Sequence, residues 1–302
     1  MDIRELYPAL ESAHYALDAL SHQAIFTDAS LAGINKSEIG LLVFLPNLEP
    51  NPITPTLLHT RYPNISSDLF LSSLISLYKS GLLVQLPANE FHISNIGSQT
   101  IHRLEKRTSD ILAGISPLPV NDLMDLASRL KEIADACFNA GTPPGNWCIQ
   151  FARKHSAGSG SPVMCRIEQF LKELMAFRDD AKLCVWKAYS VSGHAWDILT
   201  VLWLEQKLQT QQLITKIESR GFSTEQTFQA LDQMSKKGLV LTGNEEIRIA
   251  PFGAEVRKIA EDTIDRYYYA TWKSFPEKEL EQLLHLLNLF HKNIPVLSEI
   301  SY

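Results

Sequence analysis

The chain has 302 residues, of which 45% are hydrophobic and 21% are charged, and its formal net charge is −6. This length accommodates two domains of about 150 residues or one large domain, and the composition is typical of a soluble globular protein. A negative balance provides no overall positive field that would attract nucleic acid or an anionic membrane.

The N-terminal segment carries charges throughout and lacks the apolar run of a signal peptide. No run of about 18 or more apolar residues occurs, so no transmembrane helix and no membrane partner are expected. The four cysteines, Cys137, Cys148, Cys165 and Cys184, form no CxxC pair. We therefore expect free thiols in a reducing cytoplasm, with no metal and no other cofactor.

The first half predicts a series of helices followed by a hairpin. Apolar spacing indicates helices over about 3–25 and 36–46, and a short one over TPTLLHTRY. A third helix begins at the cap residues Ser66-Ser67-Asp68 and ends at Gly81, where a residue that tolerates positive φ suits a C-cap. The strands LLVQL and FHIS follow, joined by a turn at Pro87-Ala88-Asn89-Glu90, and two amphipathic helices end this half.

The second half repeats this order. Gly238 corresponds to Gly81, an offset of 238 − 81 = 157 residues, and Phe252-Gly253 corresponds to Ile96-Gly97 at an offset of 156. The match extends to three apolar residues on one helical face in each copy: Leu71, Leu74 and Leu77, and then Phe228, Leu231 and Met234. Five elements in the same order favour a tandem duplication over coincidence.

The elements of the second copy follow from the same signals. Helices are expected over about 162–186 and 194–206, and a short one over QTQQLITKIESRG. Ser223 and Gln226 have the spacing of a capping box at the start of the third helix. The strands LVLT and EIRIA follow, with a turn at Gly243-Asn244.

Helices followed by a two-stranded wing and a long helix are the plan of a winged helix-turn-helix. The passage IRIAPFGAEVRKIAEDTIDRYY resembles the wing-to-helix passage of the MarR-type family, although Ala250 and Pro251 depart from its commoner residues. The first copy has Ile93-Ser94-Asn95-Ile96-Gly97 at this place. A MarR-type subunit is roughly half as long and works as a dimer through its terminal helices. The resemblance therefore implies two subunits fused into one mainly α-helical pseudo-dimer.

The resemblance implies a first winged-helix half at residues 1–140, a linker at 141–161 and a second winged-helix half at 162–302. Glycine, proline and serine mark the linker. Trp147, Ile149 and Phe151 indicate that part of it packs against the rest of the chain. The chain is then a monomeric pseudo-dimer or forms a homodimer.

The resemblance also implies a ligand-responsive transcriptional regulator that binds duplex DNA, with the third helix in the major groove and the wing on the backbone. The second copy carries the better candidates, namely Thr224, Gln226, Gln229, Gln233, Lys236, Lys237 and the wing residue Arg248. Glutamine can bind adenine. However, neither third helix has a net charge and both wings carry glutamates, which disfavours strong phosphate binding. The alternative is that the helix candidates are ordinary exposed residues and that the wing arginine is paired with a glutamate.

Aromatic residues gather near the helix junctions of the second half. MarR-type effectors lie between the wing domain and the dimerising helices, so the resemblance implies a cleft for a small apolar or aromatic ligand. The candidate lining residues are Trp186, Tyr189, His194, Trp196, Tyr268 and Trp272. A plain aromatic core is the alternative, and His194 could equally form a polar contact at the start of its helix.

Asp262 and Asp265 share a helical face and could form an acid–base pair if burial raised the pKa of one of them. Asp110 occupies the place of Asp265 in the first copy, which favours a cap or an inter-helix ion pair. Because no GxSxG, P-loop, HExxH or dinucleotide motif occurs, no catalytic residue is assigned. The alternatives to a regulator are a small-molecule-binding protein or enzyme that no longer binds DNA, and a protein-interaction module.

Overall fold

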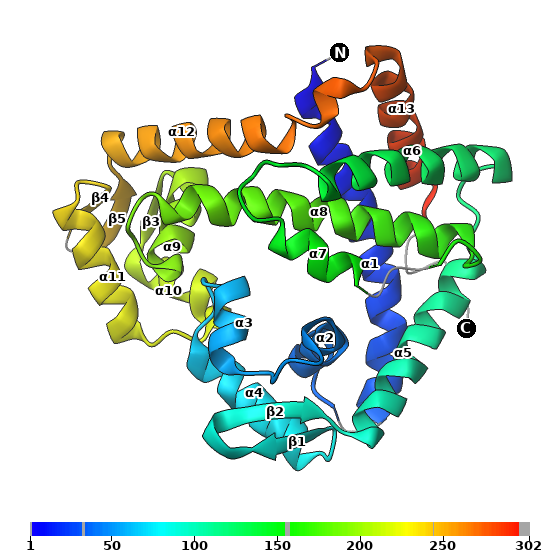
Figure 1. Cartoon of the computed structure of the whole chain (residues 1–302). Helices are drawn as coiled ribbons and strands as arrows, with labels where there is room; N and C mark the ends of the chain where they lie inside the picture. Colours follow the sequence, from blue (N-terminus) through cyan, green and yellow to red (C-terminus); the bar gives the residue numbers. More distant parts are fainter. Residues whose placement is uncertain (1, 32–33, 155–157, 244, 296–302) are drawn as a thin grey trace.

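The computed structural model describes residues 2–31, 34–154, 158–243 and 245–295 (Figure 1). Most of these residues are helical, and the strands form two small antiparallel sheets, so the prediction of a mainly α-helical fold is confirmed. A layer of long helices carries a first lobe (residues 36–93) below it and a second lobe (residues 193–249) on the left of Figure 1. Within the described ranges, no helix has both the length and the apolarity to cross a membrane.

The central layer has a single large core. Its helices are α1 (Leu6–Leu31), α6 (Val120–Phe138), α8 (Val163–Lys187), α12 (Pro251–Tyr268) and α13 (Glu277–Asn293). The first helix of the chain packs against the last one, and α8 packs against α6. The two halves of the sequence therefore interlock in this layer, since each contributes helices to one buried cluster that includes Leu10, Leu126, Leu174 and Leu283.

The first lobe contains α2 (Lys36–Phe44), α3 (Pro55–Arg61), α4 (Ser67–Lys79), β1 (Leu83–Leu86) and β2 (Glu90–Ile93). The predicted caps of α4 are present: Ser66 Oγ accepts a hydrogen bond from Leu69 N at 3.1 Å, and Gly81 has a φ of 75°. Helix α5 (Asn95–Ala113) then leads back to the central layer.

The second lobe has the same order of elements and one additional short strand. It contains α9 (Gly193–Glu205), β3 (Lys207–Gln209), α10 (Thr210–Ile217), α11 (Thr224–Lys236), β4 (Val240–Thr242) and β5 (Glu246–Ile249). The capping box at Ser223 and Gln226 is confirmed, and Gly238 has a φ of 70°. Strand β3 was not predicted; it pairs with β5 much as the single residue Ile53 bridges Phe91 in the first lobe.

A glycine follows the hairpin in both lobes, at Gly97 and Gly253, because there is no room for a side chain at either position. A Cβ on Gly97 would lie 2.1 Å from the carbonyl oxygen of Leu82, and a Cβ on Gly253 would lie 2.0 Å from that of Leu239. In each lobe the first turn of the following helix thus packs directly on the backbone at the start of the hairpin.

The predicted linker contains helix α7 (Trp147–Arg153), in which Cys148 and Ile149 are buried. Its first N–H groups are bound by Asp180 of α8, whose carboxylate accepts hydrogen bonds from Cys148 N at 2.7 Å and Ile149 N at 3.0 Å. The prediction that part of the linker packs is confirmed. Residues 155–157 of the linker and Asn244 of the second turn lie outside the described residues.

The two lobes also touch each other directly. The backbone N–H of Ser66, the N-cap of α4, donates to Arg220 O at 2.9 Å. A Cβ on Gly193, at the start of α9, would lie 2.3 Å from Pro63 O, so the backbones approach closely there. The N-terminal end of α4 therefore lies against the segment that leads into α11.

Candidate functional site

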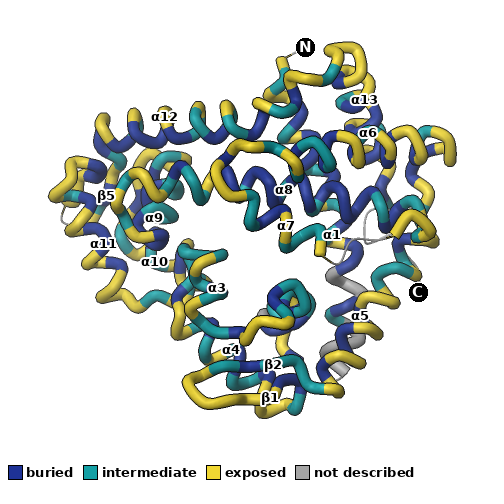
Figure 2. The backbone as a smooth tube through the Cα atoms, viewed as in Figure 1, coloured by how far each residue is buried: buried dark blue, intermediate teal, exposed yellow. Residues whose placement is uncertain are grey.

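Helix α11 buries one side in the second lobe and exposes the other to solvent (Figure 2). Thr227, Leu231 and Met234 are on the buried side. The predicted DNA-contacting residues of this region are all exposed: Thr224, Gln226, Gln229, Gln233, Lys236 and Lys237. Arg248 projects from the adjacent strand β5 with 63% of its side chain exposed. The structure thus places these candidates on the solvent side of one lobe.

Several of these side chains already have a local partner. Gln226 Oε1 accepts from the backbone N–H of Ser223 at 2.8 Å and completes the capping box. Lys236 pairs with Asp232 at 2.6 Å, Lys237 Nζ donates to the carbonyl oxygen of Ser190 at 2.6 Å, and Gln229 Nε2 lies 3.4 Å from Glu225. Among the described residues, the side chains of Thr224 and Gln233 have no hydrogen-bond partner.

Arg248 pairs with its own hairpin, as the alternative interpretation of this residue proposed. Its Nε donates to Glu246 at 2.5 Å, and Lys207 lies 3.5 Å from the same carboxylate. The hydrogen bond from Arg248 is the main reason that the pKa of Glu246 is lowered. Exposed ion pairs contribute little to stability, so Arg248 can exchange Glu246 for another anion at small cost.

The first lobe presents a different surface. The solvent side of α4 carries Asp68, Ser72 and Lys79 rather than a row of glutamines. On its hairpin, Val84 and Leu86 point to solvent. His92 pairs across the strands with Val84, as Arg248 pairs with Leu241, so a histidine takes the place of the wing arginine.

The structure does not bring the predicted ligand-lining residues into one pocket. Tyr189 and Trp196 stack with ring centroids 5.1 Å apart at the joint between α8 and α9, where Trp186 Nε1 donates to Val191 O at 3.1 Å. Tyr268 and Trp272 instead lie 5.4 Å apart in the buried core of the central layer. The aromatic-core alternative therefore accounts for the second group.

His194 connects two helices of the second lobe. Its Nε2 lies 3.1 Å from Thr227 Oγ1 of α11, and its buried ring stacks on Phe222 with centroids 3.9 Å apart. Burial lowers the pKa of His194, against a smaller opposing effect of Asp197. A polar contact in the first turn of α9 thus fits the structure better than a ligand contact.

We expect His194→Phe to flatten the pH dependence of the second lobe's stability. Because the folded pKa is depressed, the unfolded chain takes up the proton first, and wild-type stability falls as the pH drops below the unfolded value of about 6.5. Phenylalanine retains the ring stack and removes this titration. Thermal unfolding of both proteins between about pH 8 and pH 5 measures the difference; parallel curves for the two proteins contradict it.

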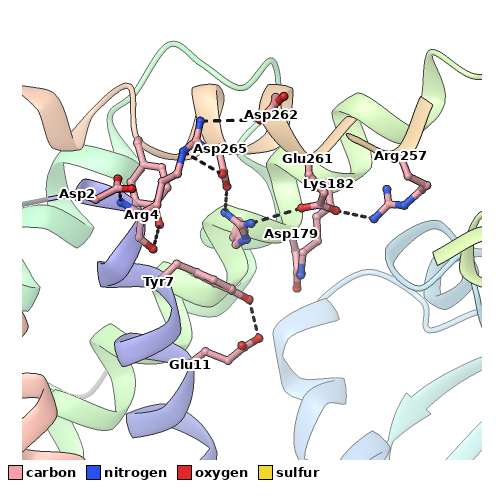
Figure 3. Close-up of polar contacts among 12 residues, drawn as sticks. Asp2, Arg4, Tyr7, Glu11, Asp179, Lys182, Arg257, Glu261, Asp262 and Asp265 are labelled. Atoms are coloured by element: carbon pink, nitrogen blue, oxygen red, sulfur yellow. Dashed lines mark hydrogen bonds and ion pairs between the residues drawn. The ribbon is translucent and has the colours of Figure 1, made fainter. Parts of the chain in front are cut away.

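A charged network lies between α8, α12 and the N-terminal segment (Figure 3). Arg178 of α8, whose side chain is 9% exposed, pairs with Asp265 at 2.9 Å and with Glu261 at 3.6 Å. Its guanidinium also lies over the ring of Tyr7, 4.0 Å from the centroid. The predicted inter-helix ion pair of Asp265 is therefore confirmed. Asp110 forms only an exposed pair with Lys106 on its own helix, at 3.4 Å.

The network extends in both directions from Arg178. Glu261 also pairs with Arg257 at 2.5 Å, and Arg4 lies 3.7 Å from Asp265. Arg257 is buried, with its guanidinium carbon 4.6 Å from the ring centroid of Trp196 and 5.3 Å from that of Trp203. These residues join the second lobe to the central layer by charge as well as by packing.

Comparison with known protein families, curated proteins and solved structures finds no match for the chain. Within the described ranges, no group of three or more His, Cys, Asp or Glu side chains is placed to hold a metal ion.

Proposed function

We propose that the chain is a DNA-binding regulator of MarR type, built from two winged helix-turn-helix lobes in one pseudo-dimeric chain. In each lobe, three helices precede a two-stranded hairpin and a long helix, which supports this assignment. The interlocked helices α1, α6, α8 and α13 supply within one chain the helical interface that MarR-type subunits form between two chains.

The second lobe is the part of the molecule that contacts DNA. The observation that carries this proposal is the exposed polar surface of α11, with Thr224, Gln229 and Gln233 beside the exposed Arg248 of the hairpin. Threonine and glutamine side chains can bond base edges in the major groove, and a wing arginine can reach the backbone or the minor groove. The first lobe lacks the matching glutamines and arginine, and the N-terminal end of α4 is held against the second lobe.

The charge of this surface sets the expected strength of binding. The cations among the predicted DNA contacts are Lys236, Lys237 and Arg248, and two of these three are paired with acids. Each phosphate contact contributes about −0.9 to the slope of log K against log salt. We therefore expect a slope of roughly −2 to −3, which is shallow for a DNA-binding protein.

Arg248→Ala tests the proposal. We expect it to weaken binding to a random-sequence duplex by roughly three- to tenfold at low salt, and to reduce the salt slope by about 1, because one phosphate contact is lost. Fluorescence anisotropy with a labelled duplex over a salt series measures both. His92→Ala, the matching hairpin position of the first lobe, is the control and should leave binding unchanged.

If the wild-type protein fails to bind duplex DNA even at low salt, or if the two variants behave alike, this function is wrong. A second candidate, binding of a protein partner, is then favoured by a separate observation. Apolar side chains are exposed at matching positions of the two lobes, with Val84 at 48% and Leu241 at 55% on the hairpins, and Ile96 at 60% and Phe252 at 56% on the helices that follow.

A further inference from the structure

A cavity of about 280 Å³ opens in the central layer where α6, α7, α8 and the loop before α8 meet. It lies apart from the surface of α11. Among the residues that the structure describes, its lining comprises three basic side chains, two carboxylates, Ser159 and Phe170. Its volume is just below the range of roughly 300–1,000 Å³ of small-molecule sites, so it suits a small ligand.

Both carboxylates of the cavity are already neutralised. Glu173 has no exposed side-chain surface, and Arg153 pairs with it at 2.5 Å while Gln169 Nε2 donates to it at 2.9 Å. Asp135 pairs with Lys131 at 2.5 Å and with Arg153 at 2.8 Å. Three cations against two anions leave the lining with one positive charge in excess.

The excess positive charge is located on Arg166 of α8. Its Nη2 donates to the thioether sulfur of Met124 at 3.1 Å, which is a weak acceptor. Its Nε is buried and has no hydrogen-bond partner. In the described part of the chain no carboxylate pairs with Arg166. A buried guanidinium N–H is costly to leave unbonded, and Arg166 lies beside a cavity in which a ligand or a water molecule can accept this hydrogen bond.

A second hollow, which is also bordered by α6, provides a contrast. It has a volume of about 440 Å³ and lies between α6 and α13. Its lining has three acids, Asp125, Glu132 and Glu279, against the two bases Arg129 and Lys278. Arg129 is paired there with Asp125 at 3.0 Å. The excess of positive charge is therefore a property of the first cavity and not of α6 as a whole.

We propose that the first cavity binds a small organic anion, either a carboxylate or a phosphate ester, with a short apolar body. Arg166 provides the main charge-assisted hydrogen bonds, and Lys131, which is paired with Asp135, lies at the rim. Ser159 is placed to donate a hydroxyl, and the ring of Phe170 packs against the apolar body. This site does not depend on the proposed DNA contact.

The test uses the full-length protein with three probes of similar shape: benzoate, phenyl phosphate and the neutral benzamide. Isothermal titration calorimetry at low ionic strength should show saturable binding of an anion and none of benzamide. Arg166→Gln should weaken anion binding at least tenfold, since it removes a charge-assisted contact. Arg129→Gln is the matched control from the second hollow and should leave the affinity unchanged. Tighter binding of benzoate identifies the ligand as a carboxylate, and tighter binding of phenyl phosphate identifies it as a phosphate ester.

Lys131→Gln is a second variant, because this side chain is 59% exposed and its replacement should not affect folding. It should weaken binding of the same anion by a smaller factor than Arg166→Gln does. The proposal is overturned if benzamide binds as well as benzoate, or if neither variant changes the affinity for the anion. It is also overturned if neither anion binds up to about 10 mM, which is beyond the weak millimolar range.

Discussion

Replacing Gly253 with alanine is expected to lower the free energy of unfolding by about 3 kcal/mol, the upper end of typical overpacking costs. The new Cβ would lie 2.0 Å from the carbonyl oxygen of Leu239 and 2.9 Å from its carbonyl carbon. Both are backbone atoms, so no side-chain rotation relieves the clash, and either the hairpin or α12 has to shift. The shift also disturbs the hydrogen bond from Ala250 N to Leu239 O. Urea denaturation measures the change.

Two other glycines make this experiment interpretable. Gly97→Ala meets the same obstacle in the first lobe, 2.1 Å from the carbonyl oxygen of Leu82, and should be comparably destabilising. Gly40→Ala lies in helix α2 with nothing within 4 Å of its Cβ, so it should stabilise by up to about 1 kcal/mol, as alanine does in a helix. If all three substitutions stabilise the protein, the helices do not pack on the hairpins as described.

The features predictable from the sequence are those determined within a few residues. Ser66 and Ser223 cap their helices through hydrogen bonds that span three residues. Gly81 and Gly238 end those helices because both adopt positive φ, which costs other residues more. The hairpins follow directly, so the local order of elements could be derived without knowledge of how the lobes pack.

Features that join distant segments could not be predicted in this way. Arg61 pairs with Asp179 at 2.7 Å across 118 residues, and Arg178 pairs with Asp265 across 87 residues. Apolar and aromatic patterns indicate that a side chain is buried but not in which cluster. For this reason the aromatic residues of the second half predict a single ligand site, although Tyr268 belongs to the central core and Trp196 to the second lobe.

One of the missed residues did carry a signal. Arg257 precedes Ala260 by three residues and Ile264 by seven, so it shares the apolar face of α12 with two buried residues. A charged residue at such a position is either paired or covered. Here it is both, since Glu261 neutralises it and the rings of Trp196 and Trp203 cover it.

Arg178→Met is expected to destabilise the protein by about 3 kcal/mol, the lower end of the cost of removing one partner from a buried ion pair. Methionine retains much of the packing volume, so the effect is mainly electrostatic. Asp265 and Glu261 would remain as partly buried carboxylates, 21% and 29% exposed, without their shared cation. The contact of the guanidinium with the ring of Tyr7 would also be lost. The midpoint of urea unfolding measures the change.

The matched control for this substitution is Lys106→Met in the first half. Lys106 pairs with Asp110, but both side chains are more than half exposed. Exposed pairs of this kind contribute about 0–1 kcal/mol, so this variant should be close to wild type. Adding Asp265→Asn to Arg178→Met should recover part of the lost stability, because it removes the carboxylate that has lost its nearer cation and keeps only the longer contact with Arg4. If the second substitution costs as much in the variant as in the wild type, the two residues are not coupled, and the network is not what fixes α12 to α8.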